Sequence, residues 1–353
     1  MLFEPTDSRV EKMGRMLTVD NVLYFNYSGA EVSFTMQGTK AEVTLISDGE
    51  KWEEHLKAWV AVFIDDEAEP VKRFILTKQR ETFTIYQGVE DKEVQIRLVK
   101  YSEVAFAKVG IESFAIDGEL LKKKEDTRLV NIEFIGDSIT CGYGIEGEYN
   151  VDTFHTAQEN PYTGYAMQVA RNINARYHLV SWSGIGVISS WVGETEEKPL
   201  NDWLMPMLYQ YTDAALSRDL ELKEWDKWDF SQFVPDIIVI HLGTNDQSYT
   251  RKIAERVHTF GEEYYHFLKF VREHNQKAHI LCVLGAMGQD LCPEIEKQVA
   301  LFNEKEHDGK VYFRALEVQK DEDGIAADWH PSQQTHNKMA AVITKEILPL
   351  LTK

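Results

Sequence analysis

The sequence has little cysteine, no long apolar run and no excess of basic residues. It has three cysteines, Cys141, Cys282 and Cys292. An odd number in a chain of this size does not indicate a disulfide framework, and three thiols are too few for a cysteine-rich metal cluster. No stretch approaches the roughly 18 apolar residues that span a bilayer, so no membrane span is expected. The 38 basic and 58 acidic side chains give a formal charge of −20, which disfavours nucleic acid and anionic membranes as partners.

The sequence also begins without the basic region and apolar stretch of an export signal. Together with the low cysteine content, this predicts cytoplasmic residence. Because single cores stop growing at about 250–300 residues, a chain of 353 residues predicts two domains. A monomer and a homo-oligomer are equally compatible with this composition.

Apolar residues alternate in the first third of the chain, which is typical of short, half-buried strands. The alternation predicts a β-sandwich or jelly-roll domain over residues 1–124. The charged stretch from Leu120 to Arg128 suits a connection between domains. The expected strands contain Phe34 and Met36, Val43 and Leu45, Val60 to Ile64, Phe74 and Leu76, Phe83 and Ile85, Val94 to Leu98, and Val109 and Ile111.

Residues 125–353 change to nearly continuous apolar runs separated by helical patterns. Strands that are apolar on both faces indicate a parallel sheet covered by helices, so we expect a doubly wound α/β domain. The expected strands are 129–135, 179–182, 236–242 and 279–284, and the expected helices are one that opens near Pro161, then 253–274, 293–307 and 332–351.

The first of these strands runs into Gly136-Asp137-Ser138-Ile139-Thr140. A serine just past the carboxyl end of a parallel strand lies where open α/β sheets bind ligands, and a following helix start directs N–H groups at developing negative charge. Ser138 is therefore a candidate nucleophile. The alternative is that Asp137 and Ser138 only cap a helix.

Two further segments follow strands at the same sheet edge. Asn245 comes directly after the strand 236–242, and its amide is a candidate donor to the oxyanion of an acyl-transfer reaction. The alternative is a structural turn, a role that we assign to Asp246. After the strand 179–182, Gly184 or Gly186 would let a main-chain N–H approach the substrate oxygen.

His330 lies in the segment Asp328-Trp329-His330-Pro331-Ser332, just before the last expected helix. Serine needs an adjacent base, which imidazole supplies near neutral pH. A loop or packing role is the alternative for a single histidine.

Occurring together and in this order, the four segments resemble the SGNH or GDSL-type hydrolases over about Val130 to Leu351. The resemblance implies a three-layer, flavodoxin-like fold that uses no metal or organic cofactor. It also implies that Ser138 is the nucleophile, that His330 is the base, and that the oxyanion hole comprises the Ser138 N–H, Gly186 and Asn245. Ala327 stands where the family's usual triad aspartate would be, so either Asp328, one residue further on, or a backbone carbonyl orients the imidazole.

The N-terminal β-sandwich and the Asp-Trp-His-Pro segment narrow the resemblance to carbohydrate esterase family 2, two-domain acetyl esterases that act on xylan and related polysaccharides. This implies removal of O-acetyl groups from sugars, with Trp182, Trp191 and Trp329 as possible contacts to sugar rings. The alternative for these tryptophans is a core or interface role. Two other functions stay open: a thioesterase or lipid esterase on the same fold, and an inactive carbohydrate-binding protein.

Overall fold

The structure is a computed structural model that describes residues 1–351, which divide into two compact units. The first unit comprises Met1–Thr127, His155–Glu159 and Thr212–Asp226, and the second comprises Arg128–Phe154, Asn160–Tyr211 and the chain from Lys227 onward. The chain leaves the first unit three residues beyond the expected boundary at 124. The prediction differs from the structure in assigning all of 125–353 to the second domain.

Side-chain hydrogen bonds explain why the two later segments belong to the first unit. Thr156 Oγ1 donates to the carbonyls of His55 and Lys57, at 3.1 and 2.6 Å. Asn26 Nδ2 donates to Asp213 Oδ2 at 2.7 Å. These partners are about 100 or more positions apart in the sequence, so no local pattern predicts them.

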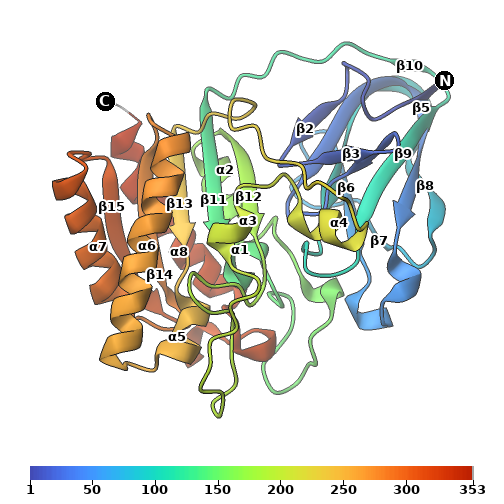
Figure 1. Ribbon diagram of the computed structural model, residues 1–353. Coiled ribbons are helices and arrows are strands. Elements are labelled where there is room, and N and C mark those ends of the chain that lie inside the picture. The colour runs from blue at the N-terminus through green and yellow to red at the C-terminus, as the bar shows by residue number, and fades with distance from the viewer. Residues whose placement is uncertain (352–353) are drawn as a thin grey trace. The chain divides into compact units, whose positions relative to one another are not determined.

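Among the described residues, the first unit contains a ten-stranded antiparallel sheet with the path β3-β4-β9-β5-β8-β6-β7 (Figure 1). Strands β1 and β4 pair with β9, and β2 and β10 pair with β5. The strands are β1 (Leu2–Phe3), β2 (Glu11–Met13), β3 (Leu17–Val19), β4 (Val22–Tyr24), β5 (Glu31–Ser47), β6 (Trp59–Ile64), β7 (Lys72–Ile75), β8 (Arg80–Lys100), β9 (Val109–Ile116) and β10 (Glu119–Leu120), and the segment Thr212–Asp226 adds helix α4 (Ala214–Asp219).

Two long strands organise this sheet. The expected strands around Phe34 and Val43 are one strand, β5, and those around Phe83 and Val94 are one strand, β8. The β5–β8 pairing shifts register near Gly38 and Ala41, and such bulges bend a strand pair without ending it. The alternating apolar side chains face a common core, and the predicted β-sandwich or jelly-roll class is confirmed as a curled antiparallel sheet.

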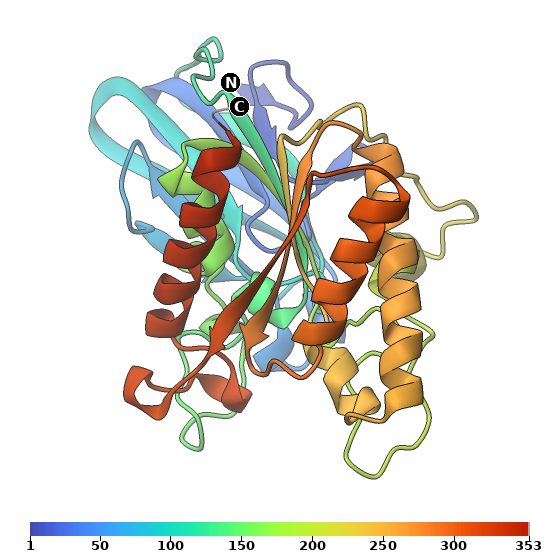
Figure 2. The same cartoon turned by 90° about the vertical axis from the view of Figure 1, so that its left-hand side faces the viewer.

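The second unit contains a five-stranded parallel sheet with the order β12-β11-β13-β14-β15, which is the flavodoxin-like order. Figure 2 shows α8 on one side of the sheet and α6 and α7 on the other. Its strands are β11 (Val130–Gly136), β12 (Ala175–Ser181), β13 (Ile237–His241), β14 (His279–Ala286) and β15 (Val311–Val318). Its helices are α1 (Ser138–Cys141), α2 (Tyr165–Asn172), α3 (Met205–Leu208), α5 (Thr244–Thr250), α6 (Ala254–His274), α7 (Cys292–Lys305) and α8 (Gln333–Ile347).

The four predicted strands and the doubly wound architecture are confirmed. The prediction missed β15, an edge strand in which only Val311 and Leu316 are buried, so that no continuous apolar run marks it. It was wrong about Pro161, because α2 begins at Tyr165 with Gly164 as its N-cap. Pro161 instead accepts the Gly164 N–H in the preceding turn.

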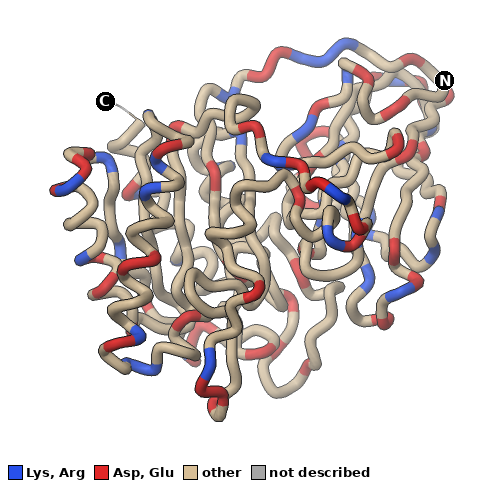
Figure 3. Tube along the Cα trace, viewed as in Figure 1, with Lys and Arg blue, Asp and Glu red and all other residues tan. Residues whose placement is uncertain are grey.

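Acidic and basic residues are interspersed along both units (Figure 3). All three cysteines are buried free thiols. Within residues 1–351, no helix combines the length and apolar character needed to cross a bilayer.

We expect Asn26→Ala to destabilise the first unit, because the Asn26 side chain is fully buried and is the hydrogen-bond partner of two other groups. Its Nδ2 donates to Asp213, and its Oδ1 accepts the Val109 N–H at 2.8 Å. Leaving buried polar groups without partners costs about 1–3 kcal/mol each. Chemical denaturation should show a loss of about 2 kcal/mol or more, whereas the exposed control Gln87→Ala should stay within about 0.5 kcal/mol. Equal stability of the two variants would contradict this account.

Candidate active site

The carboxyl ends of three parallel strands lie level with one another. Gly136 of β11 pairs in register with Ser181 of β12 on one side and with His241 of β13 on the other. In this strand order, the direction of winding reverses between β11 and β13, and ligands of such sheets bind at that point. Ser138 follows β11 by two residues, and Asn245 follows β13 by four, so both belong to this edge.

The turn after β11 is held by Asp137. Its carboxylate accepts the Ile139 N–H at 3.0 Å and caps the four-residue helix α1, whose first residue is Ser138. Burial raises the pKa of Asp137 to about 7, although the hydrogen bond from the Ile139 N–H opposes this shift. The capping alternative is therefore correct for Asp137, whereas Ser138 lines a cavity.

His330 contacts the serine directly. Its Nε2 lies 2.9 Å from Ser138 Oγ, and its Nδ1 lies 3.2 Å from the main-chain oxygen of Asp328. A carbonyl oxygen can only accept, so this arrangement favours the tautomer with the proton on Nδ1. Nε2 is then free to accept the Ser138 proton, as a general base must.

The Asp328 carboxylate points elsewhere. It accepts the Tyr143 hydroxyl at 2.9 Å, while Asp328 itself adopts a left-handed backbone conformation with φ 50°. The ring of Tyr143 packs against His330 with centroids 4.3 Å apart. Of the two groups that the sequence left open, the backbone carbonyl is the one beside the imidazole, and that carbonyl belongs to Asp328.

The imidazole stays neutral well below pH 7. Desolvation by the surrounding protein lowers the pKa of His330 to about 4, although the nearby Asp328 charge and main-chain groups of Ala327 and Asp328 favour the protonated form. A neutral ring is the form that accepts a proton from serine.

Asn245 lines the same cavity as Ser138. Its Nδ2 donates to the Ile185 carbonyl at 2.8 Å, which fixes the amide plane, and makes only a long 3.4 Å contact with Asp137 Oδ2. An NH₂ group has two hydrogens, and the one directed at Asp137 makes the weaker bond, so that N–H is the one for which a ligand oxygen in the cavity would compete.

Asp246 anchors the loop that follows β12. Its buried carboxylate accepts the N–H groups of Val187, Ile188 and Ser189 at 2.8–3.1 Å. A Cβ at Gly186 would lie 2.0 Å from the Ser189 carbonyl oxygen and 2.8 Å from the carboxylate, so only glycine fits. Asp246 therefore has a structural role, but it acts on a distant loop rather than on its own turn.

The cavity has a volume of about 420 Å³. Gly184 contributes to its lining and Gly186 does not, so the assignment of Gly186 to the oxyanion hole stays a prediction. The full lining comprises Ser138, Tyr143, Ser183, Gly184, Trp191, Thr244, Asn245, Met287, Asp328 and His330. Sequence reasoning missed Tyr143 and Met287 as candidates, since neither belongs to a recognisable polar segment at a strand end.

Of the three tryptophans predicted to contact a sugar, one lines the cavity and two do not. Trp191 lines the cavity and is 62% exposed. Trp182 packs edge-on against Trp203, with centroids 5.3 Å apart, and is not among the lining residues. Trp329 is also outside the lining, and its carbonyl accepts the Gln319 side chain.

Comparison with known proteins identifies the class. Residues 134–338 match the model of the GDSL-like Lipase/Acylhydrolase family, and residues 12–123 match the Carbohydrate esterase 2 N-terminal model. The chain therefore belongs to the GDSL-like lipase/acylhydrolase family. Its two units together place it with the two-domain family 2 carbohydrate esterases, and the resemblance seen in the sequence is confirmed.

Individual relatives agree with this assignment. Cellulase/esterase CelE of Acetivibrio thermocellus is 33% identical over 91% of this chain, which spans 37% of the length of that relative. An acetylxylan esterase / glucomannan deacetylase of Cellvibrio japonicus is 24% identical, with 98% of this chain and 90% of that protein covered. The solved family two carbohydrate esterase from Clostridium thermocellum in complex with cellohexaose has a TM-score of 0.84 at 31% identity, covering 97% of this chain and 99% of that one. The expected enzyme class, a carboxylic ester hydrolase, is confirmed by these relatives.

We expect Asp328→Asn to retain kcat within about tenfold of the wild type, because the carboxylate does not touch the imidazole. Asparagine also tolerates the left-handed conformation and still accepts the Tyr143 hydroxyl. In a Ser-His-Asp triad, the same change costs about 10⁴-fold. Steady-state hydrolysis of 4-nitrophenyl acetate distinguishes the two cases, and a loss near 10⁴-fold would place the carboxylate in the triad.

The pH profile tests the state of His330. Because its folded pKa is lowered to about 4, the neutral base persists as the pH falls through 6.5 and is lost only at lower pH. We expect kcat/KM for 4-nitrophenyl acetate to stay level from pH 8 through pH 6.5 and to fall only as the pH approaches the lowered pKa of about 4. An acid limb centred at pH 6.5 or above would show that the ring titrates as it does in water.

Proposed function

We propose that this chain is a serine esterase that removes O-acetyl groups from plant polysaccharides or oligosaccharides such as acetylated xylan, through an acetyl-enzyme on Ser138. The observation that carries the proposal is the 2.9 Å contact between Ser138 Oγ and His330 Nε2. The names of the relatives support the substrate class, since two of them are each named acetylxylan esterase / glucomannan deacetylase.

The first step transfers the acetyl group to the enzyme. Ser138 Oγ attacks the acetyl carbonyl carbon as its proton moves to His330 Nε2, and the Asp328 carbonyl stabilises the imidazolium through Nδ1–H. The N–H groups of Ser138, Gly186 and Asn245 hold the oxyanion, and each such donor typically contributes about 3–4 kcal/mol to lowering the barrier. The tetrahedral intermediate then breaks its bond to the sugar oxygen, which takes the proton from His330.

The second step releases acetic acid, which then loses its proton to the solvent to become acetate. Water gives a proton to His330 Nε2 and attacks the acetyl-enzyme, and the same donors hold the second oxyanion. Collapse breaks the bond to Ser138 Oγ, which recovers its proton from His330. Atoms and charges balance with water as the only added reactant, so the proposal includes no metal or organic cofactor.

Trp191 is the aromatic residue best placed to contact a sugar ring, because it lines the cavity while exposing most of its surface. Trp182 and Trp329 lie outside the lining, so the proposal does not use them. Cytoplasmic residence stays a prediction, and a monomer and a homo-oligomer both stay open.

Two serine and histidine variants test the chemistry. We expect Ser138→Ala and His330→Ala each to lower kcat on acetylated xylo-oligosaccharides by at least about 10³-fold, because each removes one member of the proton-transfer pair. The exposed controls Ser231→Ala and His266→Ala should match the wild type. Turnover near the wild-type rate in either cavity variant would refute the mechanism.

The acyl preference tests the substrate class. Comparing 4-nitrophenyl acetate with the octanoate, we expect the acetyl ester to have the higher kcat/KM. A preference for octanoate would instead support the thioesterase or lipid-esterase alternative. Binding of xylo-oligosaccharides without hydrolysis of any ester would support an inactive carbohydrate-binding protein.

A further inference from the structure

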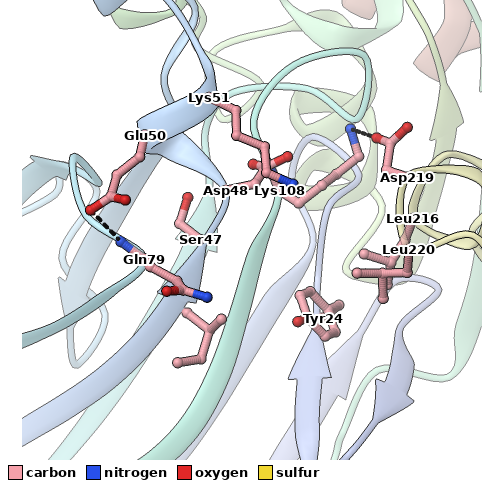
Figure 4. A pocket seen from close by; sticks show the side chains of 11 residues that line it. Tyr24, Ser47, Asp48, Glu50, Lys51, Gln79, Lys108, Leu216, Asp219 and Leu220 are labelled. Carbon is pink, nitrogen blue, oxygen red and sulfur yellow. Dashed lines mark hydrogen bonds and ion pairs between the residues drawn. The ribbon is translucent and has the colours of Figure 1, made fainter.

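The first unit has a cavity of its own that shares no residue with the one at Ser138. Its volume is about 290 Å³, near the lower end of the roughly 300–1,000 Å³ typical of small-molecule sites. Figure 4 shows the side chains that line it. They come from Tyr24 of β4, from the end of β5 and the turn after it, from Gln79 and Lys108, and from Leu216, Asp219 and Leu220 of the segment that carries α4.

Its charged wall is rigid. Lys108 is 2% exposed, and its Nζ donates to the carbonyls of Val104 and Phe106 at 2.9 and 2.6 Å and pairs with Asp219 at 3.1 Å (Figure 4). A buried ammonium with three acceptors has no donor left over, so Lys108 fixes the wall and neutralises one carboxylate.

The Asp48 carboxylate, like the Lys108 ammonium, is held by hydrogen bonds to the protein. One carboxylate oxygen accepts the Lys108 main-chain N–H at 2.7 Å, and the other accepts Trp52 Nε1 at 3.1 Å. Each carboxylate oxygen accepts two hydrogen bonds, so Asp48 keeps acceptor capacity toward the cavity. The indole of Trp52 is a built-in reporter of this site.

Three other polar groups of the lining are uncommitted. The Tyr24 hydroxyl, the Lys51 ammonium and the Gln79 side-chain amide have no hydrogen-bond partner among residues 1–351. They offer donors and acceptors of several kinds beside the fixed carboxylate of Asp48.

The lining also has an apolar part. It includes Ile46, Leu216 and Leu220, and the ring of Tyr24 adds a flat surface. The charges nearly balance, with Asp48, Glu50 and Asp219 opposing Lys51 and Lys108, so the cavity has little net attraction for a strongly charged ligand.

We propose that this cavity is a second binding site, one that takes a small neutral polyhydroxylated ligand, a saccharide of one or two rings. The hydroxyl groups of such a ligand match the mixed donors and acceptors of Tyr24, Asp48 and Gln79, and its C–H faces match the leucines and the tyrosine ring. The site makes no use of Ser138, so the inference goes beyond the proposed function and does not rest on it.

The test follows the tryptophan indole signals of the full-length protein by ¹H–¹⁵N NMR during titration with xylobiose and cellobiose. Trp52→Phe and Trp191→Phe assign the signals of the two cavities. We expect a saturable shift of the Trp52 signal with at least one disaccharide. The affinity derived from that shift should be at least about tenfold weaker in Lys51→Ala/Gln79→Ala, since each lost hydrogen bond weakens binding several-fold. The matched surface pair Lys78→Ala/Gln87→Ala should bind like the wild type.

Four results would overturn the proposal. The first is that neither disaccharide gives a saturable shift of the Trp52 signal, and the second is that Lys51→Ala/Gln79→Ala binds with the affinity of the wild type. The third is that the Trp52 shift is lost in Trp191→Ala. The fourth is that glucosamine or glucose 6-phosphate binds more tightly than both disaccharides. Hydrolysis of 4-nitrophenyl acetate by each variant is measured in parallel. Because the binding shift and the esterase rate are separate readouts, failure of this site and failure of the proposed function are distinguishable.

Discussion

The register of β11 with its two neighbours is the constraint on which the active site depends. Gly136 is level with Ser181 and with His241, so the segments that follow the three strands start from the same edge of the sheet. If the register of β11 against β13 shifted by one residue, Ser138 would move relative to Asn245 by about 3.3 Å. A displacement of about that size exceeds the tolerance of a hydrogen-bonded site. The continuous apolar strands, buried on both faces, hold that register.

Main-chain groups make several of the hydrogen bonds that position side chains and loops around this edge. The Asp328 carbonyl, rather than its carboxylate, lies beside His330 Nδ1, and the left-handed conformation of Asp328 accompanies that arrangement. The Asp246 carboxylate accepts three N–H groups of the loop that follows β12. The carboxylates near the site therefore shape the backbone, and the backbone in turn orients the reactive side chains.

The N-terminal unit combines a curled antiparallel sheet with two segments that come later in the chain. One of these segments brings Asp213 to Asn26 and Asp219 to Lys108, and so completes the cavity lined by Tyr24 and Asp48. A unit assembled this way has a binding surface that none of its sequence segments specifies alone.

The sequence by itself determined the two-domain plan, the fold class of each domain and the identities of Ser138, His330 and Asn245 as candidates. Strand periodicity and residues at strand ends are local properties, and local patterns reveal them. It did not reveal β15, the return of Thr212–Asp226 to the first unit, or the place of Tyr143 in the cavity, and it did not separate Trp191 from Trp182 and Trp329. Only the tertiary structure decided that a carbonyl of Asp328 faces the imidazole, because a main-chain oxygen carries no mark in the sequence and its direction depends on backbone angles.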